Sequence, residues 1–154
     1  MSAMIDGVPR SAFAHHLVVL PHHVDEQGHA SSVAILDWLM DAAIAHSAAL
    51  GWDHDAYTRL GGTFVVRRHE IEYMRAAYEG EAVTVWTWPS AIETASAERC
   101  YVAVRDNAGA IARARTRWAF VRIVDLRPLR IPDDLRTTFD PARFAAGDGA
   151  PAGV

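Results

Sequence analysis

Apolar positions along this chain recur with the period of a β-strand in several segments, and they fill one long segment of helical composition. The first apolar run, 16–20, predicts a strand that stops at Pro21. After residue 62, β-branched and aromatic residues predict four more strands, with Pro89 ending the second of them and 106–109 forming a hairpin turn. These four segments are 63–73, 82–88, 94–105 and 111–124.

One long helix is predicted between the first strand and the other four. Segment 33–50 has helix-forming composition, and Gly51 suits the position just after a helix end. Ser31 or Ser32 is available as the N-cap. The apolar residues of the segment form a stripe that is wider than one side of a helix. We therefore expect this helix to be enclosed by the rest of the fold.

The order of these elements predicts an α+β domain. Tight turns between the later strands make neighbouring strands antiparallel, and one enclosed helix needs a sheet that wraps it. We expect an antiparallel sheet of about five strands around one central helix. The domain is predicted to cover 14–139, with flexible termini at 1–13 and 140–154, because the C-terminal tail is rich in Ala, Gly and Pro.

Composition narrows the class of protein. The 154 residues carry a net charge of −4 and no run of five or more basic residues, which argues against nucleic acid as a partner. Charged residues interrupt the longest apolar stretch, and the first residues lack the layout of a signal peptide, so we expect a cytoplasmic protein without membrane contact. Cys100 is the only cysteine, which excludes an intrachain disulfide.

The segment just before the predicted helix carries the candidate chemistry. Asp25 lies a few residues ahead of the helix start, where unpaired backbone N–H groups and a partial positive charge stabilise an oxyanion. A thioester carbonyl bound there becomes electrophilic, and a nearby carboxylate can attack it or activate water. Spacing alone leaves a second interpretation open, in which Asp25 only complements the helix dipole.

The segment 23–32, His-Val-Asp-Glu-Gln-Gly-His-Ala-Ser-Ser, resembles the D-x-D-x-x-G-H-V-N-N signature of the 4-hydroxybenzoyl-CoA thioesterase-like hot-dog proteins. The likeness extends over 17–139 in the same order of segments. The other similar segments are the helix at 36–46, the second strand at 65–75, the turn at 80–81 and the closing R-P-x-x-I-P pattern at 127–132.

This resemblance implies a hot-dog thioesterase domain over 14–139 that hydrolyses an acyl-CoA or acyl-carrier-protein thioester. The catalytic carboxylate would be Asp25, and the oxyanion donor the backbone N–H of Ser32 or a neighbour. Apart from the resemblance, we expect His29 to orient the loop or line the pocket, with a purely structural histidine as the alternative. Coenzyme A would enter as part of the substrate, with no separate cofactor. The family also implies homodimers that pair their sheets edge to edge, with interfacial active sites, and often a dimer of dimers.

The signature is not matched at every position. His23 replaces the first Asp, Ser31 and Ser32 replace the Asn pair, and Ile35 stands where an aromatic residue is common. The carboxylate is retained, and backbone donors do not depend on side-chain identity. The departures leave the preferred acyl group open.

Other residues are weaker candidates. In other hot-dog thioesterases an acidic residue on the central helix is catalytic, so Asp41 is the reserve candidate, with an Arg-paired helix carboxylate as the alternative. Arg68 and His69 are tentative contacts for substrate or coenzyme A, with a solvated or interface pair as the alternative. The histidines at 22, 23 and 29 lack Cys partners and a zinc-type spacing, so we expect no metal site.

A row of arginines on the last strand, 113, 115 and 117, is interpreted as a charged outer sheet face rather than a phosphate site. Two rival functions remain open at this stage. One is a hot-dog 3-hydroxyacyl-thioester dehydratase, although its His-loop pattern is absent. The other is a non-catalytic module that binds an acyl ligand, because fold does not fix function.

Overall fold

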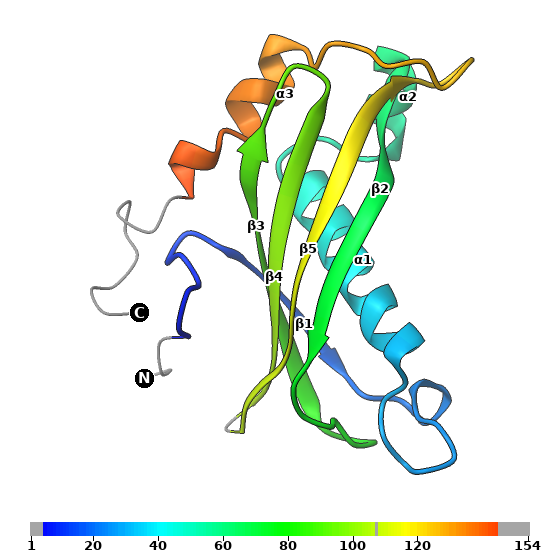
Figure 1. Ribbon diagram of the computed structural model, residues 1–154, viewed down its shortest axis with the longest axis vertical. Helices are drawn as coiled ribbons and strands as arrows, with labels where there is room; N and C mark the ends of the chain where they lie inside the picture. The colour runs from blue at the N-terminus through cyan, green and yellow to red at the C-terminus, as the bar shows by residue number, and fades with distance from the viewer. Residues whose placement is uncertain (1–4, 107, 145–154) are drawn as a thin grey trace.

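The computed structural model describes residues 5–106 and 108–144, and it is built from one long helix, a sheet and short helical turns (Figure 1). The strands are β1 Phe13–Val18, β2 Gly62–Tyr73, β3 Ala82–Ile92, β4 Ser96–Arg105 and β5 Gly109–Arg122. The helices are α1 Ser32–Ala49, α2 His54–Leu60 and α3 Asp133–Thr138, with 3-10 turns η1 Pro21–His23 and η2 Pro141–Arg143.

The five strands form one antiparallel sheet in the order β1-β3-β4-β5-β2. Strands β3, β4 and β5 are consecutive in sequence and adjacent in space, as their short connections require. The order leaves β1 and β2 as the two edges of the sheet. The predicted α+β hot-dog architecture is therefore confirmed.

The core lies between α1 and one face of the sheet, and Figure 1 shows the helix running along that face. Trp38 and Leu39 of α1 pack in one cluster with Val85 of β3 and Tyr101 of β4, all nearly inaccessible to solvent. Small side chains allow close approach, since Ala112 of β5 is fully buried in the same cluster. This packing fixes the direction of α1 and therefore the position of both its ends.

Helix α1 begins and ends with the expected caps, but it is covered on one side only. The hydroxyl of Ser31 accepts a hydrogen bond from the Ala34 N–H at the start, and Gly51 has a φ of 93° just after the end. Val33 and Ile44 are 67% and 66% exposed. The prediction of a fully enclosed helix is therefore wrong for this open face.

A second cluster closes the far end of the fold. Phe120 of β5 packs with Ile131 and Leu135 of the C-terminal segment. Gly62 lies directly against the Phe120 ring, where a Cβ atom would come within 2.7 Å of it. The C-terminal segment therefore belongs to the domain up to at least α3.

The two chain ends also contribute buried side chains. Val8 packs with Val102 and Val104 on the outer face of β4, and Phe144 is buried beside His46. The predicted flexibility of 1–13 and 140–154 stays a prediction, and residues 1–4 and 145–154 lie outside the described part of the chain. So does residue 107 of the predicted hairpin turn, although β4 and β5 pair on either side of it.

The structure differs from prediction most clearly at the first strand, at Pro89 and at α2. The first strand is Phe13–Val18 rather than 16–20, and Leu20 is the N-cap of η1, which begins at Pro21. Pro89 does not end β3: it sits at a bulge between Pro89 and Ala91, where a missing N–H is tolerated. Helix α2 was not predicted, although Asp53 caps its start and Gly61, with a φ of 80°, ends it.

Candidate functional site

The loop that carries Asp25 folds back on itself before α1. Val24 and Ala30 form an isolated antiparallel bridge, and the Asp25 N–H donates to the His29 carbonyl over 2.8 Å. The turn closes with a hydrogen bond of 3.0 Å from the Gly28 N–H to the Asp25 carbonyl, and Gly28 has a φ of 82°. This φ lies in the left-handed region, which explains the glycine at this position.

The Asp25 side chain is exposed and engaged through one oxygen. Its Oδ1 accepts hydrogen bonds from the Gln27 N–H at 2.9 Å and the His29 N–H at 3.2 Å. No partner of Oδ2 is found among the described residues. The carboxylate therefore stabilises its own loop and still offers one free oxygen to a substrate or a water molecule.

The start of α1 presents free donors next to this loop. The Ser31 N–H donates to the His23 carbonyl at 2.9 Å, and the Ser31 hydroxyl and carbonyl accept from Ala34 and Ile35. Within the described ranges, the N–H groups of Ser32 and Val33 have no hydrogen-bond acceptor, as is usual for a first helical turn. Both residues are exposed. An oxyanion could therefore reach these donors from solvent.

The histidines of the loop contact aromatic rings. His29 meets Tyr78 edge to face at 5.1 Å between ring centroids, and His23 meets Trp38 at 5.3 Å. Burial, and to a lesser degree the neighbouring His22, lower the pKa of His23 below 6.5. The Nδ1 atom of His23 accepts a hydrogen bond from the Leu20 N–H. His23, which replaces an acidic residue of the signature, thus anchors the loop to the core.

The remaining predicted residues lie apart from the Asp25 loop. Asp41 is exposed on α1 and takes part in none of the ion pairs between described residues, so the predicted alternative of an Arg partner is wrong. Arg68 pairs with Glu70 at 2.7 Å on β2. His69 shares a hydrogen bond of 2.8 Å with Thr116. Their roles toward a substrate stay predictions.

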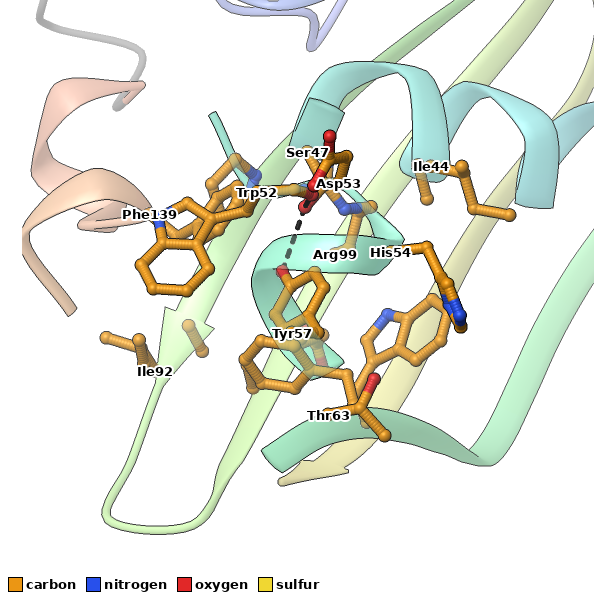
Figure 2. Close-up of a pocket in the computed structure, with 17 residues that line it drawn as sticks. Ile44, Ser47, Trp52, Asp53, His54, Tyr57, Thr63, Ile92, Arg99 and Phe139 are labelled. Atoms are coloured by element: carbon orange, nitrogen blue, oxygen red, sulfur yellow. Dashed lines mark hydrogen bonds between the residues drawn. The ribbon is translucent and has the colours of Figure 1, made fainter. Parts of the chain in front are cut away.

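A cavity opens at the opposite end of α1 from Asp25 (Figure 2). Its volume is about 270 Å³, and α1, α2, the starts of β2 and β4 and the C-terminal parts of β3 and β5 contribute to it. Ser47 and Tyr57 share a hydrogen bond of 2.8 Å at its wall, drawn as a dashed line in Figure 2. Its other lining residues are mostly apolar or aromatic, among them Trp52, Phe64, Ile92, Trp118 and Phe139.

Arg99 is the least expected residue of this cavity. It is 8% exposed, and its Nη1 donates to His46 Nδ1 at 2.9 Å and to Thr87 Oγ1 at 3.1 Å. Burial lowers the pKa of His46 to about 3, with smaller contributions from Arg99 and Arg143. This cluster was not predicted from the sequence. Arg99 is in phase with the inward-facing Tyr101 and Ala103 of β4, but Val102 and Val104 on the other face are also apolar and buried, so the sequence does not mark the inward face.

Between residues 5 and 144, leaving aside 107, no three His, Cys, Asp or Glu side chains lie close enough to hold a metal ion. No single described helix is long and apolar enough to cross a membrane, and α1 with α2 reach that length and composition only as a pair bent by 69°.

Comparison with known proteins gives one family match and many similar structures. Residues 10–139 match the family described as the acyl-ACP thioesterase N-terminal domain. A search of curated proteins gives no significant match. A hypothetical protein from Staphylococcus aureus, solved in complex with CoA, aligns with a TM-score of 0.82 at 14% identity, over 100% of this chain and 92% of that one.

Two solved thioesterases align over part of their length. A putative oleoyl thioesterase from Lactobacillus plantarum has a TM-score of 0.80 and 20% identity, over 88% of this chain and 52% of that one. The 12:0-ACP thioesterase from Umbellularia californica has a TM-score of 0.74 and 20% identity, over 85% of this chain and 53% of that one. This chain thus spans about half of either protein, and the resemblance to hot-dog thioesterases is confirmed. The chain belongs to the acyl-ACP thioesterase N-terminal-domain family, which places it among the thioester hydrolases.

Proposed function

We propose that this chain hydrolyses an acyl thioester of acyl-carrier protein or coenzyme A at the start of α1, with Asp25 as nucleophile or general base. The observation that carries the proposal is the Val24–Ala30 bridge, which orders a loop that carries a carboxylate with one free oxygen and leads directly into the unpaired N–H groups of α1. The family match, the neighbour solved with CoA and the neighbour described as a 12:0-ACP thioesterase support these two carriers.

The chemistry follows from these two groups. The carbonyl oxygen of the thioester accepts hydrogen bonds from the backbone N–H of Ser32 and its neighbour, which stabilise the negative charge that develops there. Asp25 either attacks the carbonyl carbon, forming an anhydride that water then opens, or takes a proton from an attacking water molecule. The thiol leaves with a proton, and the acyl group leaves as a carboxylic acid.

A second copy of the chain would complete the site. Neither the cavity beside Arg99 nor the outer hollow around Arg115 is lined by Asp25, His29 or Ser32. Strand β2 is a free edge of the sheet, and the Tyr73 hydroxyl at its end donates to the Ser32 carbonyl at 3.3 Å. We propose that two copies pair along β2, as a homodimer or within a dimer of dimers, so that each supplies a wall to the other's site.

The test is hydrolysis of a panel of acyl-CoA and acyl-carrier-protein substrates, followed by detection of the released thiol. Asp25→Asn keeps the shape and removes the base, so we expect a loss of about a hundredfold or more in kcat. Glu26→Gln, which changes the neighbouring exposed carboxylate, is the matched control and should keep activity.

Other results would contradict the role of Asp25 or favour another function. Wild-type kcat in Asp25→Asn would refute the role of Asp25, and loss in Asp41→Asn alone would transfer that role to the reserve residue. Ligand binding without thiol release would favour an acyl-binding module. An enoyl product from a 3-hydroxyacyl thioester would favour a dehydratase.

A further inference from the structure

The cavity at the end of α1 contains a buried cation without a counter-ion. Arg99 takes part in none of the ion pairs found among the described residues. Its two hydrogen-bond partners, His46 and Thr87, are both uncharged at neutral pH, because the pKa of His46 is lowered to about 3. A buried charge of this kind is costly unless a partner or a ligand compensates it.

Arg99 lines the cavity and has donors without a partner among the described residues. Both hydrogen bonds come from Nη1, so Nη2 and Nε have no partner in the described chain. The side-chain atoms that are sealed in protein without a partner are Trp38 Nε1, Trp86 Nε1 and Tyr101 Oη, and those of Arg99 are not among them. Arg99 lines the cavity and is drawn among its walls in Figure 2.

The acidic residues at the cavity do not neutralise this cation. Asp53 uses Oδ1 to cap α2 at 2.9 Å from the Ala56 N–H, and Glu98 accepts a hydrogen bond from Ser90 at 3.1 Å. Neither lies within 4.0 Å of a nitrogen of Arg99. Among the described residues, no carboxylate therefore forms an ion pair with Arg99.

The other walls suit an apolar chain. Trp52, Phe64, Ile92 and Trp118 surround the space, and the Phe139 ring lies 5.8 Å from the guanidinium carbon of Arg99. An engineered apolar cavity of about 150 Å³ binds benzene. By proportion, 270 Å³ accommodates about ten non-hydrogen atoms.

We propose that this cavity binds a medium-chain aliphatic carboxylate, with the carboxylate on Nη2 and Nε of Arg99 and the chain among the aromatic walls. A carboxylate matches the planar fork of a guanidinium. Ser47, at the cavity, lies 15 residues beyond Ser32 on α1, about 22 Å along the helix axis, so this site is separate from the Asp25 loop. The proposal does not depend on thioester hydrolysis.

Calorimetric titration of the wild-type chain with octanoate, which has ten non-hydrogen atoms, tests the proposal first. Octanol has the same chain without the charge, and we expect it to bind about tenfold more weakly or worse. Equal affinity for octanol and octanoate would refute the role of Arg99. Absence of octanoate binding at millimolar concentration would refute the site.

A pair of variants tests whether the charge of Arg99 binds octanoate. Arg99→Met fills a similar volume without charge, and replacement of a buried ion by an apolar side chain is often tolerated. We expect octanoate affinity to fall about tenfold or more in this variant and to stay unchanged in Arg117→Met, which alters an exposed arginine of the outer face. Unchanged octanoate affinity in Arg99→Met would overturn the proposal.

The resonances of the tryptophan indoles test where the aliphatic chain of octanoate binds, without any substitution in the protein. Trp52 and Trp118 line the cavity, whereas Trp86 and Trp88 pack on the other face of the sheet with Val102. In a protein labelled with ¹⁵N-tryptophan, octanoate should shift the first pair and leave the second pair in place. Shifts confined to Trp86 and Trp88 would place the ligand elsewhere and refute the assignment. None of these measurements uses thiol release, so they fail or succeed independently of the proposed hydrolysis.

Discussion

Arg99 donates a hydrogen bond from Nη1 to Nδ1 of His46 across 2.9 Å, so the imidazole must be neutral where the guanidinium is charged. An acceptor at Nδ1 requires the proton to sit on Nε2. Burial is the main reason that the pKa of His46 falls to about 3, and the charges of Arg99 and Arg143 add to it. The pair therefore links the stability of the domain to pH.

The first prediction is that His46 makes the folded state less stable in acid. The unfolded chain takes up a proton near pH 6.5, whereas the folded chain takes it up only near pH 3. The contribution of His46 to the free energy of unfolding is therefore fully present above pH 6.5. It declines as the pH falls toward 3, by at most about 1.4 kcal/mol per pH unit. Urea unfolding between pH 7 and pH 5 measures this slope.

The control is His46→Gln, which offers Arg99 an amide oxygen and does not titrate. Other groups contribute equally to both proteins, so the difference between the two slopes belongs to His46. We expect the unfolding free energy to decline less steeply in the variant. Parallel slopes would mean that His46 has the same proton affinity in the folded and unfolded chains.

Much of the fold could be predicted because its signals are local. Ser31 and Gly51 bound α1, and turn residues separate three consecutive strands. Pro89 misled the prediction, because a proline is excluded from a regular ladder but tolerated at a bulge, and only the register reveals the bulge. Helix α2 was missed because seven residues give little periodicity, although its caps, Asp53 and Gly61, are visible in the sequence.

One part of the candidate site could be predicted from the sequence, and the other part could not. The loop with Asp25 and the start of α1 are contiguous in sequence, so their neighbourhood was predictable. The cavity around Arg99 joins residues of six elements and was not. Strand β4 is apolar on both faces, because the N-terminal segment covers Val102 and Val104. The alternation of apolar and polar residues therefore does not tell whether the Arg99 side chain points toward the core or away from it.

The second prediction concerns the contact of Gly62 with Phe120. A Cβ at position 62 would lie 2.7 Å from the Phe120 ring, closer than side-chain atoms tolerate. Gly62→Ala should therefore destabilise the domain by about 1–3 kcal/mol through overpacking. In a Phe120→Leu background the same substitution should cost about 1 kcal/mol less, because the ring is gone. Equal costs in both backgrounds, measured by urea unfolding, would rule out this steric origin.

The third prediction tests pairing of two chains along β2. Val66 is 41% exposed on this edge strand, beside a bulge between Val66 and Arg68. A lysine on a strand edge opposes pairing with another strand, so Val66→Lys should lower the molar mass measured by light scattering from that of a dimer to that of a monomer. Val124→Lys, at a residue 85% exposed and outside the sheet, should leave the dimer intact. A monomeric wild-type chain would contradict the proposed interface.

The last prediction connects the start of α1 with activity. Ser31 caps the Ala34 N–H at 3.1 Å and leaves the donors of Ser32 and Val33 free for a substrate. Ser31→Ala should lower the unfolding free energy by about 1 kcal/mol, and it should reduce kcat for thioester hydrolysis because a frayed first turn no longer orients those donors. Ser31→Asn restores a capping oxygen, and we expect it to recover both quantities. Recovery of stability without recovery of kcat would show that the Ser31 hydroxyl itself contacts the reacting group, since the helix start would then be intact.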